Sequence, residues 1–140
     1  MVKAITLDET WDYIAECDRD GEDQTIWLLG TIDAVLLAQL EDDLLHFKVG
    51  AEEGDTETKL KMNEKNVEVV RHGLKGFTNF TDNGGAEVRY QKRSVTRAGR
   101  SVSVMEDATL RRIPAPIIRE LAEQILAGNS LTEDEVKNSD

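Results

Sequence analysis

Cysteine, aromatic side chains and long apolar runs are all scarce in this chain, and each shortage excludes a class of protein. Cys17 is the only cysteine among 140 residues, so an intrachain disulfide and a metal site of several thiolates are excluded. We expect Cys17 to be a buried or half-buried, inert thiol. Aromatic residues make up 5% of the chain, which favours a core built mostly from Leu, Ile and Val. The chain lacks a signal-peptide pattern and a run of roughly 20 apolar residues, so we expect neither secretion nor insertion into a membrane.

Sequence motifs of catalysis and metal binding are missing as well. There is no Gly-rich phosphate loop, no dinucleotide fingerprint and no nucleophile elbow. His46 and His72 are far apart and neither belongs to a pattern that places two ligands on one helical face. The aspartates within residues 18–23 resemble a calcium loop, but Gly21 comes too early and Leu29 stands where the twelfth-position Glu is needed. The sequence therefore predicts a protein that is not an enzyme and has no metal or cofactor.

Charge is distributed along the chain in three bands. Residues 1–58 contain 16 acidic and 3 basic side chains, residues 59–112 contain 6 and 12, and residues 113–140 contain 6 and 2, so the net charges are −13, +6 and −4. The acidic excess disfavours general binding to nucleic acid. Two interpretations of the bands stay open. They could lie against one another inside one domain, or the acidic face of one copy could meet the basic face of the next.

The length fits a single domain, residues 1–140, which begins with short strands. Strand patterns occur at residues 2–7, 11–17 and 25–29. The acidic turn at 18–24 predicts a hairpin between the last two of these strands. This hairpin contains Trp11 and Trp27. The two tryptophans could be core anchors or protein-interface anchors, and core is favoured because no aromatic cluster lies nearby in the sequence.

The first helix is predicted over residues 32–47, with Thr31 as its N-cap. Its apolar stripe consists of Ile32, Val35, Leu36, Leu40, Leu44 and Phe47. Residues 48–58 combine glycines and acids without periodicity and predict a mobile acidic loop that becomes ordered on contact with a neighbour. The contact residues that we expect there are Glu52, Glu53, Asp55 and Glu57.

A second helix is predicted from Asn63 to Leu74, with Gly73 and Gly76 near its end. The Asp-Asn-Gly-Gly sequence at 82–85 predicts a tight turn before a strand at 86–91.

A basic arm follows at residues 89–104. It contains an Ala-Gly turn and a second strand that alternates valine with serine. We expect this arm to contact an acidic protein surface rather than nucleic acid, because aromatic residues are few and the surrounding charge is negative. Its candidate interface residues are Arg89, Lys92, Arg93, Arg97 and Arg100.

The last part of the chain is predicted to be helical. Asp107 has the position of a cap for a turn over residues 108–112. The prolines at 114 and 116 introduce a long amphipathic helix that ends at Gly128, and Thr132 and Glu135 have capping-box spacing for a short final turn. The helical segment spans 114–137. Together the elements predict an α+β fold, in which a small antiparallel sheet and hairpins pack with two to three amphipathic helices.

From Thr25 to Ser139 the order of these elements resembles small structural or assembly proteins of tailed bacteriophages. Residues 73–80 (GLKGFTNF) are similar to a family pattern with tryptophan at the position of Phe77, and Ile113-Pro114 stands in place of Leu-Pro. The C-terminal sequence LTEDEVKN matches a Leu-Ser/Thr-Glu-x-Glu-x-Lys-Asn pattern. The basic arm at residues 89–104 is longer than is usual in such proteins. None of these positions is catalytic in such a family.

The resemblance implies a non-enzymatic structural protein of the virion, at the head-tail junction, in the tail or on the capsid surface. Its expected partners are other phage structural proteins and copies of itself, and assembly would take place in the host cytoplasm. Two alternatives stay open. The first is a tail-assembly chaperone that is absent from the mature particle, and the second is an acidic inhibitor that imitates nucleic acid.

Overall fold

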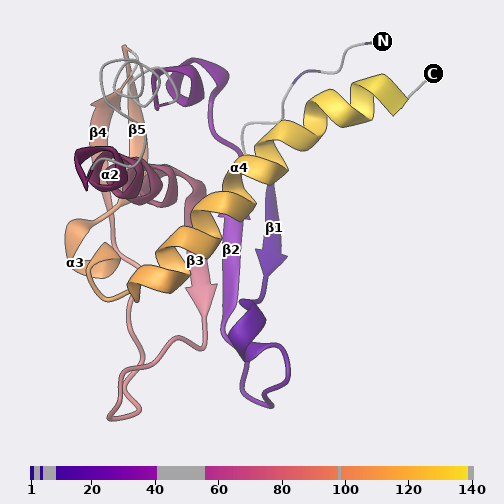
Figure 1. The fold of residues 1–140 in the computed structure, drawn as a ribbon. Coiled ribbons are helices and arrows are strands. Elements are labelled where there is room, and N and C mark those ends of the chain that lie inside the picture. Colours follow the sequence, from indigo (N-terminus) through magenta and orange to yellow (C-terminus); the bar gives the residue numbers. More distant parts are fainter. Residues whose placement is uncertain (2–3, 5–8, 41–55, 98, 139–140) are drawn as a thin grey trace.

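The structure of the chain is a computed structural model that describes residues 1, 4, 9–40, 56–97 and 99–138, with side chains at 56–62 and 130–138 left outside the description. It confirms the α+β class. Strands β1 (Thr10–Tyr13), β2 (Ile26–Gly30) and β3 (Leu74–Thr78) form an antiparallel sheet in that order. Strands β4 (Lys92–Arg97) and β5 (Arg100–Met105) form a separate hairpin, and helix α4 (Ala115–Asn138) crosses the three-stranded sheet (Figure 1).

The first hairpin is confirmed, but its first strand is shorter than predicted. β1 ends at Tyr13, and a 3₁₀ turn, η1 (Glu16–Asp18), follows it. The Asp18 carboxylate accepts a hydrogen bond from the backbone N–H of Thr25 at 2.7 Å, so a side chain closes the loop where the strand was expected to continue. Cys17 lies in this turn and is exposed, so the prediction of a buried or half-buried thiol was wrong.

The first helix is capped two residues later than predicted. Residues 34–40 are helical, and Asp33 rather than Thr31 caps them, because its Oδ1 accepts N–H bonds from Val35 at 2.7 Å and Leu36 at 3.3 Å. Leu36 is buried, but the Val35 side chain is 59% exposed, so Val35 does not belong to the buried stripe. Residues 41–47 lie outside the described residues.

Helix α2 (Thr56–Gly73) begins before the predicted start at Asn63. The residues before Asn63 form no apolar stripe, but Glu, Lys, Leu and Met among them are good helix formers and extend the helix. Residues 56–58 are therefore helical rather than part of an acidic loop. Strand β3 starts directly at Leu74, which was predicted to be the end of the helix, and Phe77 lies inside this strand.

The turn at 82–85 is confirmed, whereas the strand predicted at 86–91 is not formed. The Asp82 carboxylate accepts N–H bonds from Gly84 and Ala86, and only an isolated bridge between Thr81 and Glu87 follows. After this bridge, the backbone N–H of Gln91 donates to the Thr109 hydroxyl instead of to a neighbouring strand.

Two predictions about the C-terminal helices were wrong. Asp107 does not cap helix α3 (Asp107–Leu110), since the N-cap is Glu106 and the Asp107 carboxylate binds Arg71 instead. Gly128 does not end α4, which continues to Asn138, so no separate capped turn forms at 132–135. A Cβ on Gly128 would overlap the indole ring of Trp11, so this glycine permits close packing of the helix on β1.

The core lies between α4, α2 and the inner face of the three-stranded sheet. It is mainly aliphatic, as expected, and its fully buried members include Leu29, Leu74, Leu121 and Ile125. An aromatic cluster adjoins it, in which the rings of Trp27, Phe77, Phe80 and Tyr90 contact one another with centroid separations of 5.0–5.7 Å. This cluster was not predictable from local sequence patterns, because its members come from separate segments.

We predict that Gly128→Ala lowers the free energy of unfolding by about 1–3 kcal/mol, as overpacking does, despite the better helix propensity of alanine. Urea unfolding of a double-mutant cycle with Trp11→Val checks the cause. When the indole is absent, Gly128→Ala should be neutral or stabilising. An equal loss in both backgrounds would contradict the packing explanation.

Candidate functional site

The five basic residues predicted as interface residues lie together on and beside the β4–β5 hairpin. Arg89, Lys92, Arg93, Arg97 and Arg100 are all exposed, and we call them the basic hairpin surface. Strand β5 lies against α2 and β3, so β4 is the outer strand of the hairpin. The predicted Ala-Gly turn falls between the paired residues Arg97 and Arg100; Gly99 has a left-handed conformation (φ 76°), and Ala98 lies outside the described residues.

The base of the hairpin is fixed by one buried hydroxyl. Thr109, which is 2% exposed, accepts a hydrogen bond from the N–H of Gln91 at 3.1 Å and donates one to the carbonyl oxygen of Arg89 at 3.2 Å. These bonds connect α3 with the segment that leads into β4. The orientation of the β4–β5 hairpin relative to α3 therefore depends on Thr109.

Two of the five basic residues are paired with carboxylates. Arg100 donates to Asp33 at 2.9 Å, which joins the central basic band to the first acidic band, and Arg93 lies 3.9 Å from Asp107. The N–H groups of Val35 and Leu36, and then Arg100, lower the pKa of Asp33. Within the described part of the chain, Arg89, Lys92 and Arg97 have no ion-pair partner.

The predicted acidic contact lies mostly outside the described residues. This applies to Glu52, Glu53 and Asp55 of the expected loop. Glu57 belongs to α2, but its side chain is not described. The predicted contact of this segment with a neighbour therefore stays a prediction.

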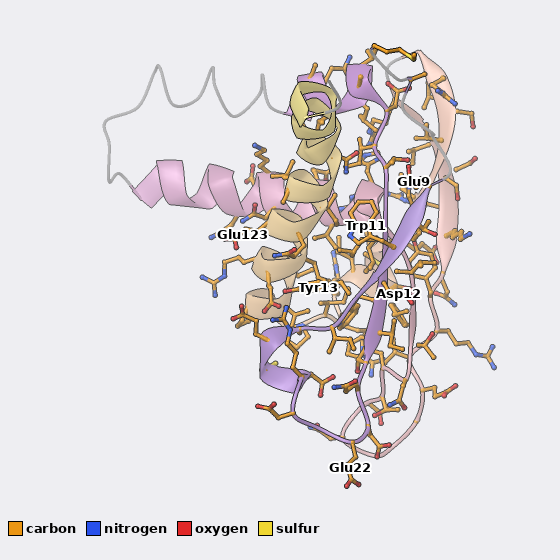
Figure 2. The ribbon with its side chains drawn as sticks, turned by 90° about the vertical axis from the view of Figure 1, so that its right-hand side faces the viewer. Glu9, Trp11, Asp12, Tyr13, Glu22 and Glu123 are labelled. Carbon is orange, nitrogen blue, oxygen red and sulfur yellow. The ribbon has the colours of Figure 1, made fainter. Side chains whose placement is uncertain are left out.

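A different acidic surface adjoins the edge strand β1. Glu9, Asp12, Glu22 and Glu123 are exposed on this side of the molecule (Figure 2), and none of them has an ion-pair partner among the described residues; we call them the acidic face. Sequence reasoning missed this surface. The available signal was the alternation of residues 10–13, in which Thr10 and Asp12 face outward while Trp11 and Tyr13 face inward.

The two tryptophans take part in packing rather than in the exposed surface. Trp27 is 3% exposed and belongs to the core, and Trp11 is half-buried against Gly128 of α4. Neither indole is therefore displayed as a protruding anchor. The core interpretation holds for Trp27, although aromatic partners from a distant segment, Phe77 and Phe80, contact the indole.

A cavity of about 530 Å³ lies between α2, α3 and the start of α4. Its apolar part is formed by Val67, Leu110, Ile113 and Ile118, and its polar part includes Arg71, Arg111 and Arg119. The charge of Arg71 is matched by Glu68 and by Asp107, whose pKa is lowered by the guanidinium. The arrangement is apolar with a basic rim, and the described side chains around it include no pair of groups suited to acid–base chemistry.

His72, in the last turn of α2, is a buried titratable group. It is 4% exposed, and its Nε2 has no hydrogen-bond partner among the described residues and lies 3.9 Å from Oε2 of Glu68. Burial lowers the pKa of His72 to about 4; Glu68 opposes this shift, and Arg97, Lys75 and Arg71 add to it. The imidazole is therefore neutral at physiological pH.

Within the described residues, no three His, Cys, Asp or Glu side chains gather closely enough to hold a metal ion. None of the helices in this part of the chain is long and apolar enough to cross a membrane. Comparison of the chain with protein-family models, with curated proteins and with solved structures gave no match.

We predict that Thr109→Val lowers the free energy of unfolding by about 1–3 kcal/mol, because the variant leaves the N–H of Gln91 and the carbonyl of Arg89 without their partner. Thr109→Ser, which keeps the hydroxyl, should lower the free energy of unfolding by clearly less. Chemical denaturation of both variants measures the difference. Equal losses would contradict the larger role of the hydroxyl, because Thr109→Val removes the hydroxyl and keeps the methyl group, whereas Thr109→Ser does the reverse.

The stability of the protein should fall as the pH falls from 6.5 to 4. The pKa of His72 is about 4 in the folded chain and 6.5 in the unfolded chain, so in this range the unfolded state binds a proton that the folded state excludes. The loss of folding free energy that His72 causes approaches about 3 kcal/mol at pH 4. Urea unfolding across this range should show a shallower dependence for His72→Leu, and an unchanged slope would contradict the assignment.

Proposed function

We propose that this chain is a non-enzymatic structural protein of a tailed-bacteriophage virion, present in several copies and held to its neighbours by complementary charge. The main support is the pair of oppositely charged surfaces on one small molecule. The basic hairpin surface keeps three cations without ion-pair partners among the described residues, and the acidic face consists of unpaired carboxylates. Surfaces of opposite sign at different places suit repeated contacts between copies.

The residues behind the family resemblance have structural positions that agree with this proposal. Gly73 ends α2 so closely against α4 that a Cβ there would lie 2.5 Å from Cγ2 of Ile125. Phe77 and Phe80 belong to the aromatic cluster. These positions determine the fold, and the function is left to the surfaces, as expected for a protein that acts by shape and charge.

The partners in this proposal are copies of the same chain and other phage structural proteins, and the site of action is the virion. The head-tail junction, the tail and the capsid surface all need such contacts. The exposed basic hairpin opposes the alternative of an inhibitor that imitates nucleic acid, since such a surface must be uniformly negative.

Quantitative mass spectrometry of purified, DNA-filled particles of the encoding phage tests the proposal. We expect peptides of this chain at a fixed ratio to the major capsid protein, and that ratio separates a ring of a few copies from a tube or a capsid-wide layer. Absence from particles together with abundance in infected-cell lysate would contradict the proposal and favour a tail-assembly chaperone.

A further inference from the structure

Four strands in the described part of the chain lie at the end of a sheet or hairpin; β3 and β5 contact each other and α2, whereas β1 and β4 are the outer strands. β1 lies at one end of the three-stranded sheet, and β4 is the outer strand of the hairpin; no other strand in the described part of the chain pairs with either edge. An open edge presents unpaired N–H and C=O groups that can accept a further strand. Figure 2 looks onto β1, which faces the viewer.

The hydrogen-bond register defines which backbone groups are available on β1. Thr31 donates to the carbonyl of Glu9 at 3.1 Å, so residues 9, 11 and 13 form the hydrogen-bonded pairs with β2. Because such pairs alternate in an antiparallel ladder, the N–H and C=O groups of Thr10 and Asp12 point to the outer edge.

The same argument applies to β4. Glu106 donates to the carbonyl of Gln91 at 2.8 Å, so residues 93, 95 and 97 are bonded to β5. The backbone groups of Lys92, Ser94 and Thr96 therefore point to the outer edge, and the side chains of these three residues are exposed.

Charge determines which edges can pair. Joining two β1 edges would bring Glu9 and Asp12 of both copies together, and joining two β4 edges would bring together Lys92, Arg93 and Arg97 of both copies. Like charges facing each other across strands are destabilising. A β1 edge against a β4 edge instead places carboxylates opposite cations. Arg19, whose guanidinium lies over the Tyr13 ring at 5.6 Å from its centroid, is a cation beside β1.

We propose that the outer edge of β4 in one copy adds as a strand to the outer edge of β1 in the next copy, so that copies join head to tail. This inference rests on the proposed multi-copy role and names its interface. Because the two edges are different surfaces, the contact is heterologous and each copy keeps one edge free for a further neighbour. Repetition gives a closed ring or an open tube, depending on the rotation between copies.

A charge-swap experiment on the full chain tests this pairing. The variant Glu9→Lys/Asp12→Lys has two basic edges, and Lys92→Glu/Arg97→Glu has two acidic edges. We expect sedimentation velocity at low salt to show self-association of the wild type, a loss of about tenfold or more in affinity for each variant alone, and recovered association in their equimolar mixture. An Arg111→Glu/Arg119→Glu control, which has the same charge change as Lys92→Glu/Arg97→Glu at a different place, should associate like the wild type.

Ser94→Pro separates strand pairing from a purely electrostatic contact. The N–H of Ser94 points outward, so proline removes a donor from the open edge and no hydrogen bond between β4 and β5. With the fold checked by circular dichroism, we expect weakened association without any change of charge. A monomeric wild type, a mixture that associates no better than its components, a control that is weakened equally, or full association of Ser94→Pro would each overturn the proposal.

These outcomes are independent of the particle analysis. If the chain is present in virions but the mixed variants do not associate, the edge pairing is wrong and the structural role stands. If the edges pair in solution but the chain is absent from particles, the virion role is wrong and the pairing stands.

Discussion

The close packing of α4 on α2 and on the three-stranded sheet is the constraint on which the rest of the structure depends. Two glycines permit it: Gly128 lies against the Trp11 indole of β1, and Gly73, at the end of α2, lies against Ile125. Leu121, Ala122 and Ile125 are then fully buried. Burial of these side chains supplies the main favourable free energy of folding, and the short strands would not be stable without it.

Polar contacts from α4 fix the position of the edge strand. The Tyr13 hydroxyl donates to Glu120, and burial together with this carboxylate raises the pKa of Tyr13 to about 12. The Asn129 side chain accepts the N–H of Ile32 at 2.8 Å and donates to the carbonyl of Gly30 at 3.4 Å. The helix thus holds β1 at one edge of the sheet while the opposite edge leads to α2 and the basic hairpin. The two charged surfaces are separated because the sheet that α4 holds in place lies between them.

Local patterns predicted the features that depend on neighbouring residues. The acidic turn at 18–24, the turn after Asp82 and the left-handed Gly99 between β4 and β5 all follow from residues within a few positions of one another. Features that depend on distant partners were not predictable in this way. Gly128 has the character of a helix terminator, yet its role is set by Trp11 at the other end of the chain. The basic half of the candidate site was found from composition, whereas the acidic face beside β1 was not, because the acidic contact was predicted in the loop at residues 48–58.

Hydrogen exchange tests the central claim, that copies join through the edge of β1, most directly. The amides of Thr10 and Asp12 are unpaired among the described residues and should exchange fast in the free protein, whereas those of Trp11 and Tyr13 are bonded to β2. Exchange would be compared by mass spectrometry between the purified protein and assembled particles, on peptides that cover residues 9–14 and 92–97. The account predicts new protection of both segments on assembly, with the loop around Glu22 unchanged. Equal exchange of the β1 peptide in the free and assembled protein would contradict it.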